Sequence, residues 1–136
     1  MSEERTVKIF DVATSGPQPD AGLVVSTKGA LMVHLSSFLK RDPGILEIVS
    51  PEGTRLHLGL GGRYACAQIT AANSLPPYLV AQAGETTASE DVEFLLGDTP
   101  TPVVPEECIS VPEAVRIAEH FFDTGQPDPT ITWKKI

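Results

Sequence analysis

Hydrophobic and polar positions follow two different periods along this chain of 136 residues. In residues 26–44 and 110–125, apolar side chains recur every three or four positions, a spacing that predicts amphipathic helices. Other segments, such as residues 45–50 and 54–61, are continuously apolar or alternate with a period of two, which predicts strands. The chain is therefore expected to combine both kinds of element.

The second predicted helix has clear start and stop signals. Ser110 and Glu113 have the S-x-x-E spacing of a capping box, and Pro112 falls in the first turn, where its missing N–H costs little. Gly125 is placed to end the helix in a left-handed conformation, and Pro127 follows it. The face expected to pack on the core consists of Ala114, Ile117, Ala118, Phe121 and Phe122.

The order of the predicted elements indicates the fold class. Pro-Glu-Gly at 51–53 separates two apolar runs and is typical of a hairpin, whereas residues 97–107 are expected to form an extended, proline-rich connection. Strands separated by one early and one late helix predict an α+β fold. We expect residues 1–136 to form a single domain, with a mostly antiparallel sheet of about five to six strands and two main helices packed on one face.

The acidic side chains are unevenly distributed along the chain. The formal net charge is −8, and no Lys or Arg occurs between Tyr64 and Val115. The acids of this segment are Glu85, Glu90, Asp91, Glu93, Asp98, Glu106, Glu107 and Glu113. An acidic surface disfavours nucleic acid as the direct ligand, because phosphate binding needs the opposite charge. It suits a basic protein partner, although a plain solvated face is the alternative explanation.

The sequence lacks patterns of catalysis and metal binding. His34, His57 and His120 do not pair with other ligands at metal spacing, and no nucleophile elbow such as G-x-S-x-G occurs. The glycine-rich residues 59–62 have no following Lys-Ser/Thr, so a tight turn or bulge is expected there rather than a phosphate loop. We therefore predict no enzyme activity, no catalytic residues, no metal and no cofactor.

Cysteine usage and hydropathy indicate the compartment. Cys66 and Cys108 are far apart in the sequence and form no CxxC pattern, so both are expected to be reduced, buried thiols. The first residues lack the basic start and apolar run of a signal peptide, and no stretch reaches the roughly 18–20 apolar residues that span a bilayer. The sequence predicts a cytoplasmic protein that does not bind membranes.

The segment from Glu113 to Trp133 resembles the C-terminal region of the Imm1 family of bacterial immunity proteins. In that family, a helix ends in a paired-aromatic run of the type FF-x-T-G-x-P, and a strand carrying Trp follows. Residues 55–69 (RLHLGLGGRYACAQI) resemble, more loosely, the strand–glycine–strand centre of the family. We expect the motif to be structural, with its aromatic side chains anchoring the sheet. Its residues here are Phe121, Phe122, Thr124, Gly125, Pro127 and Trp133.

The resemblance implies that the protein is an antidote. Imm1-like proteins accompany polymorphic toxins, often nucleic-acid deaminases delivered by contact-dependent or type VI secretion, and bind them in the producing cell. The expected partner is therefore a cognate toxin domain, with a basic, zinc-dependent cytidine deaminase as the first hypothesis. Such an enzyme must hold nucleic acid in a cationic cleft, which an acidic surface can occupy as a phosphate mimic. The expected partner contacts are Tyr78, Glu85, Glu90, Asp91, Glu93 and Asp98.

Three other functions are compatible with the sequence. The chain could neutralise a different class of toxin, such as a nuclease or an ADP-ribosyltransferase, which the neighbouring reading frame would reveal. It could instead be a small-molecule-binding α+β domain with a pocket between helix and sheet, which ligand-induced thermal shifts would detect. A weak hydrolase would need a base close to a nucleophile.

Overall fold

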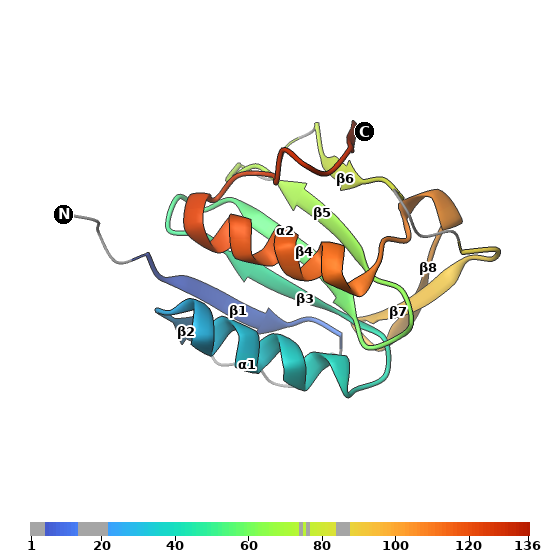
Figure 1. The fold of residues 1–136 in the computed structure, drawn as a ribbon, viewed down its shortest axis with the longest axis horizontal. Helices are drawn as coiled ribbons and strands as arrows, with labels where there is room; N and C mark the ends of the chain where they lie inside the picture. Colours follow the sequence, from blue (N-terminus) through green and yellow to red (C-terminus); the bar gives the residue numbers. More distant parts are fainter. Residues whose placement is uncertain (1–4, 14–21, 74, 76, 84–87) are drawn as a thin grey trace.

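The computed structural model describes residues 5–13, 22–73, 75, 77–83 and 88–136. Two helices cover one face of a sheet that has nine strands within this described part of the chain (Figure 1). Every strand pair is antiparallel except the short β3–β7 pair. The predicted α+β class is confirmed, as is the placement of both helices on one face, but the predicted count of five to six strands is too low.

The elements alternate along the chain as the periodicity indicates, with strands on either side of each helix. In chain order they are β1 (Val7–Asp11), β2 (Leu23–Val25), α1 (Lys28–Leu39), β3 (Gly44–Val49), β4 (Arg55–Leu60), β5 (Cys66–Thr70), β6 (Leu79–Ala81), β7 (Val92–Leu96), β8 (Thr99–Val103), the short 3-10 helix η1 (Pro105–Glu107), α2 (Val111–Thr124) and β9 (Trp133–Lys135).

The strand order in the sheet is β2-β1-β3-β4-β5-β6-β9, so the last strand of the chain lies at one edge. The β7–β8 hairpin joins separately, because β7 pairs in parallel with the start of β3, where Gly44 faces Leu95. Two further hydrogen bonds hold the hairpin turn: Gly97 and Asp98 donate their backbone N–H groups to carbonyls just beyond β1. The hairpin is therefore attached to the main sheet through one end of β7 and through its turn.

The helix α2 has the caps that its sequence predicts. The Ser110 hydroxyl accepts the Glu113 N–H at 3.2 Å, and the Glu113 carboxylate accepts the Ser110 N–H at 3.1 Å. Gly125 ends the helix with φ 69°, a left-handed conformation that costs a residue without a β-carbon little. Five apolar side chains of α2 are buried against β4 and β5: Ala114, Ile117, Ala118, Phe121 and Phe122.

The helix α1 is shorter than its sequence pattern suggests. Its N-cap is Thr27, whose hydroxyl accepts the Ala30 N–H at 3.1 Å. Leu31 and Leu35 are buried, and the helix ends at Leu39, with Lys40 as its C-cap. Apolar side chains of α1, α2 and the facing side of the sheet form one hydrophobic core.

Two strands were not anticipated from the sequence. Residues 97–107 were expected to be a connection, but Thr99–Val103 (TPTPV) forms the edge strand β8 despite its two prolines. Pro100 and Pro102 are two positions apart, so both missing N–H groups point the same way. They can be directed away from β7, the only described partner of β8, which is why the ladder tolerates them. The other unanticipated strand, β2, has only three residues, two of them exposed.

Candidate functional site

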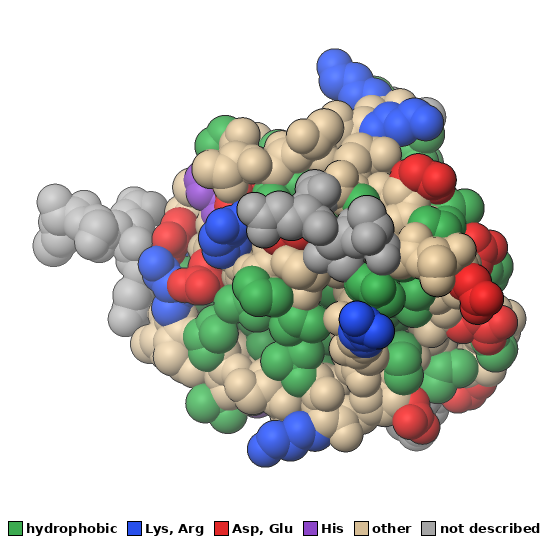
Figure 2. Space-filling model, turned by 45° about the vertical axis from the view of Figure 1, so that its right-hand side comes forward, with side chains coloured by type: hydrophobic (Ala, Val, Ile, Leu, Met, Phe, Trp, Pro, Cys, Tyr) green, Lys and Arg blue, Asp and Glu red, His purple; other side chains and the backbone are tan. Residues whose placement is uncertain are grey.

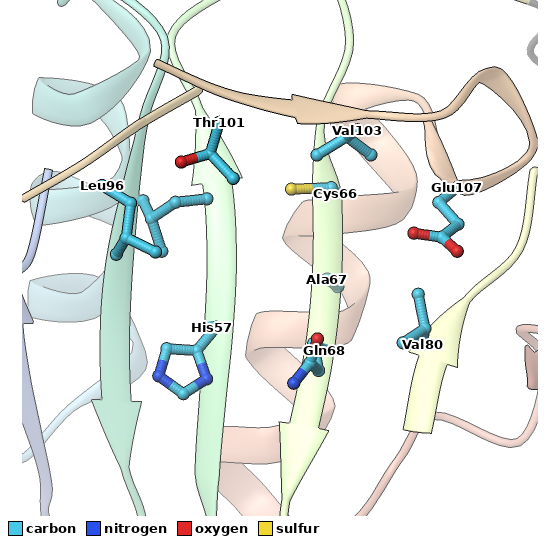
Figure 3. A pocket seen from close by; sticks show the side chains of 10 residues that line it. His57, Cys66, Ala67, Gln68, Val80, Leu96, Thr101, Val103 and Glu107 are labelled. Carbon is cyan, nitrogen blue, oxygen red and sulfur yellow. The ribbon is translucent and has the colours of Figure 1, made fainter. Parts of the chain in front are cut away.

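The β7–β8 hairpin passes over the helix-free face of the sheet, across the ends of β4 and β5 (Figure 3). Its anchor is Phe94, which is fully buried. The ring of Phe94 fits against Gly59 on β4: a β-carbon at that position would lie 2.8 Å from the ring and 2.5 Å from the Cys66 sulfur. Glycine is therefore required at this contact for a steric reason, and the hairpin is held as a second layer over the sheet.

A row of polar side chains crosses the centre of the helix-free face. Glu47, His57 and Gln68 face one another on β3, β4 and β5. The Glu47 carboxylate accepts a hydrogen bond from Arg55 Nη1 at 2.8 Å and lies 3.1 Å from His57 Nε2. The hydrogen bond with His57 and the nearby Arg55 charge lower the pKa of Glu47, although burial opposes this shift. Glu47 is only 13% exposed, so it orients the imidazole as a fixed, negatively charged group.

A pocket of about 280 Å³ lies between the hairpin and this row. Its walls combine apolar side chains from both layers with a few polar groups. The apolar walls include Ile45, Val80, Leu96 and Val103, and the polar lining residues are His57, Gln68, Thr101 and Glu107. Pockets that take cofactor-sized ligands usually measure about 300–1,000 Å³. The volume and the mixed lining suit a single side chain or a small polar group.

The thiol of Cys66 also lines the pocket, on β5, where it faces Gly59, whereas His57 faces Gln68. Burial raises the pKa of Cys66 to about 12. A thiol with this pKa is almost entirely protonated at pH 7, so Cys66 is not an activated nucleophile. Both cysteines are free; Cys108 is buried as expected, whereas Cys66 is only partly buried, and burial raises the pKa of Cys108 as well. Cys66 and His57 therefore do not provide a thiolate–imidazole pair.

The acids named from the sequence as partner contacts divide into two groups. Glu90 and Asp91 are exposed directly before β7, and Glu93 is exposed on the outer side of that strand, beside Asp42. Asp98 is exposed at the hairpin turn, one strand length or about 17 Å from the first group. In Figure 2, which brings the right-hand side of Figure 1 forward, several acidic side chains gather at the right of the molecule.

The remaining predicted contacts are not brought to this hairpin. Tyr78 is half-buried and pairs through its backbone with Ile136, at the end of β6 that lies away from the hairpin. Strand alternation places its side chain on the helix-free face, as for Val80. Glu85 lies outside the described residues. The predicted partner contacts therefore lie on two separate surfaces. The exposed acids among them, Glu90, Asp91, Glu93 and Asp98, lie on or next to the β7–β8 hairpin, and Tyr78 does not.

The C-terminal motif lies on the other side of the sheet. Phe121 is fully buried and Phe122 is 7% exposed, both in the core. Gly125 caps α2, and Pro127 is half-buried in the turn that follows. Trp133 is half-buried on β9, and its indole N–H donates to the Asp128 carbonyl at 2.9 Å. This region shapes the helix-covered half of the molecule rather than the pocket.

Comparison with known proteins adds an independent observation to this geometry. The sequence model of the family described as Immunity protein Imm1 matches residues 19–135, most of the chain. The chain belongs to the Imm1 family of immunity proteins. The resemblance seen in the sequence is thereby confirmed, and membership of Imm1 indicates an antidote that binds a cognate toxin. No curated protein matched the chain in a sequence comparison.

Metal-binding clusters and membrane-spanning helices are absent from the part of the Imm1 chain that the structure describes. Within the described ranges, no three His, Cys, Asp or Glu side chains are grouped so that they could hold a metal ion. None of the described helices is both long and apolar enough to cross a membrane. The pocket residues Gln68, Thr101 and Glu107 were not identified from the sequence. Strand alternation could have placed Gln68 beside His57, but nothing local indicates that β8 and η1 lie above them.

Proposed function

We propose that the chain neutralises its toxin by binding it directly through the β7–β8 hairpin and the acids around it. The observation that carries this proposal is the exposed position of Glu90, Asp91 and Glu93, directly before and at the start of β7, in the layer that covers part of the helix-free face. Leu96 and Val104 are exposed on the same layer, 44% and 43% respectively, and supply apolar area for a partner to cover. Acidic groups around an apolar centre are a common arrangement in protein interfaces.

We propose further that the toxin acts on nucleic acid, and that the chain occludes its substrate cleft in the cytoplasm of the producing cell. An enzyme that binds phosphates needs a cationic cleft, and carboxylates can form charge-assisted hydrogen bonds with its Arg and Lys side chains. A cytidine deaminase is the first activity to test, with a nuclease or an ADP-ribosyltransferase as the alternatives. The toxin domain encoded by the neighbouring reading frame is the reagent for this assay, and inhibition should be competitive with nucleic acid.

Charge reversal tests the docking surface. The variant Glu90→Lys with Asp91→Lys should slow association with the toxin about tenfold or more, because the acids steer a basic partner. The matched control reverses Glu119 and Asp123 on α2, on the opposite side of the sheet, and should leave the rate within a factor of about three. Stopped-flow experiments at low and high salt measure the association rates of both variants. Equal rates for the two variants would mean that the hairpin acids serve only solubility.

The small-molecule alternative receives less support. A ligand site between helix and sheet was the form expected from the sequence, but the pocket described above lies on the helix-free face. Its volume is at the low end for cofactor-sized ligands. A thermal-shift screen with metabolites that gave a specific, saturable stabilisation would favour this alternative over toxin binding.

A further inference from the structure

We propose that the pocket beneath the β7–β8 hairpin receives the side chain of one arginine from the toxin. This inference rests on the proposed function and specifies it, because it names the chemistry of the central contact. The pocket is formed by the hairpin, η1 and the helix-free face, so it lies within the surface to which the toxin is proposed to bind.

Two polar side chains in the pocket have unused hydrogen-bonding capacity. Neither the Glu107 carboxylate nor the Gln68 amide has a hydrogen bond or ion pair with any residue that the structure describes. Figure 3 shows the Glu107 carboxylate between Val103 above and Val80 below, on the opposite side of the pocket from Leu96. Thr101 donates its hydroxyl hydrogen to the Thr99 carbonyl, so its oxygen can still accept a hydrogen bond. Together these groups offer acceptors to a cationic donor.

The walls suit the aliphatic part of an arginine side chain. Val80, Val103 and Leu96 provide apolar surface on opposite sides, along which a three-carbon stem can pack. The volume of about 280 Å³ accommodates a long side chain together with a few waters. The planar guanidinium carries five N–H donors and is weakly hydrated, so it matches several acceptors within a partly apolar pocket better than a lysine ammonium does.

The charges around the pocket are compatible with a bound cation. His57 is already engaged by Glu47, and Arg55 is paired with the same carboxylate. The Cys66 thiol is neutral at pH 7, as shown by its raised pKa. No Lys or Arg is among the residues that line the pocket. Among the described lining residues, Glu107 is therefore the charged group without an ion-pair partner, and Asp91 and Glu106 lie close enough to act with it on the Cys108 thiol, so they add negative potential.

The first experiment needs only this protein. Titration with N-acetyl-arginine amide, followed by ¹H–¹⁵N NMR, should give saturable shifts at Gln68, Val80, Thr101 and Glu107, with a Kd on the order of millimolar. The neutral isostere N-acetyl-citrulline amide is the control ligand and should bind at least about tenfold more weakly. Equal shifts with both ligands, or shifts located elsewhere, would overturn the proposed preference for a cation.

The second experiment compares neighbouring residues in binding to the toxin. Glu107→Gln should raise the Kd about tenfold or more, because an arginine would lose its charged partner in a partly buried site. Glu106→Gln is the matched control, since Glu106 is exposed and does not line the pocket; its effect should stay below about fivefold. In the same way, Thr101→Tyr should fill the pocket and weaken binding, whereas Thr99→Tyr, at an exposed position of the same strand, should not.

The outcomes separate this inference from the proposed function. If the toxin binds and the reversal of Glu90 and Asp91 slows association, but Glu107→Gln and Thr101→Tyr have no effect, the arginine pocket is wrong and the docking surface stands. If the wild-type chain does not bind the toxin at all, the proposed function is wrong, and the toxin is not the source of the cation. Thermal unfolding of each variant excludes misfolding as the cause of a lost interaction.

Discussion

The two faces of the sheet are made by the same strands and yet have opposite character. On the helix-covered face, Leu46, Leu58 and Ala67 face one another across β3, β4 and β5, and each is at most 2% exposed. At the adjacent position of the same strands, the helix-free face presents Glu47 and His57, which are joined by a hydrogen bond. A shift of one residue along a strand exchanges the two environments, because successive side chains point to opposite sides.

The difference between the two faces indicates which one stabilises the fold and which one is available to bind a partner. The helix-covered face is completed by the chain's own helices, and its apolar contacts leave no room for a partner. The helix-free face is only partly covered, since the β7–β8 hairpin closes one end and leaves a pocket beneath it. We therefore expect substitutions on the first face to change mainly stability, and substitutions on the second to change mainly binding.

The largest effect on stability is expected from Phe121→Ala. Phe121 is fully buried on the helix-covered face, and removing its ring should lower the free energy of unfolding by about 3–5 kcal/mol. Urea denaturation measures this loss. The folded variant should still bind the toxin normally, and the milder Ile117→Val should do so with a loss of about 1 kcal/mol. Impaired toxin binding by either folded variant would contradict the assignment of the helix-covered face to stability alone.

A smaller effect is expected from Gly59→Ala on the opposite face. The added methyl group would meet the Phe94 ring and the Cys66 sulfur, and such overpacking costs about 1–3 kcal/mol. The hairpin should also loosen, so amide exchange in β7 should become faster than in β4. Combining the change with Phe94→Leu should restore part of the stability, because the two residues are in contact. Strictly additive losses would show that Phe94 does not anchor the hairpin against Gly59.

The smallest effect concerns Glu47 and depends on pH. Its pKa in the folded protein lies below the ordinary value of 4.5, chiefly because of its hydrogen bond with His57. The carboxylate therefore contributes its full stabilisation above about pH 4.5, and this is lost as the pH falls through the lower, folded-state pKa. Glu47→Gln should cost about 1–2 kcal/mol at pH 7 and remove this part of the acid dependence. Identical pH profiles of denaturation for variant and wild type would contradict the role given to the pair.

Local signals in the sequence were sufficient to predict α2 with its caps, and the presence of α1. The capping box of Ser110 and Glu113, the left-handed Gly125 and the buried face of α2 involve residues only a few positions apart, so their spacing alone predicts them. The strand containing His57 was also predictable, because alternation of apolar and polar residues indicates which side chains point away from the core. The prolines of β8 concealed a strand, since their tolerance depends on which edge faces a partner.

The candidate site was less accessible to sequence reasoning. The uneven distribution of charge predicted Glu90, Asp91 and Glu93 as partner contacts, and the structure places all three around one end of β7. Tyr78 belongs to the same stretch of sequence but lies at the far end of β6, because sequence proximity does not fix the direction in which a strand runs. The sequence could not indicate that Glu107 lines the pocket. Its neighbour Glu106 has the same chemistry, and only Glu107 is among the lining residues.

The sequence by itself determined the presence of the two helices, the caps of α2, the alternation that separates the faces of the strands, and the concentration of acids in one segment. These depend on interactions between residues that are close along the chain. Only the tertiary structure decided that β7 and β8 fold over the helix-free face, with Phe94 against Gly59 and Glu107 beside Val80. Such contacts join distant segments, and their formation depends on steric fit between packed layers, which no local pattern of residues specifies.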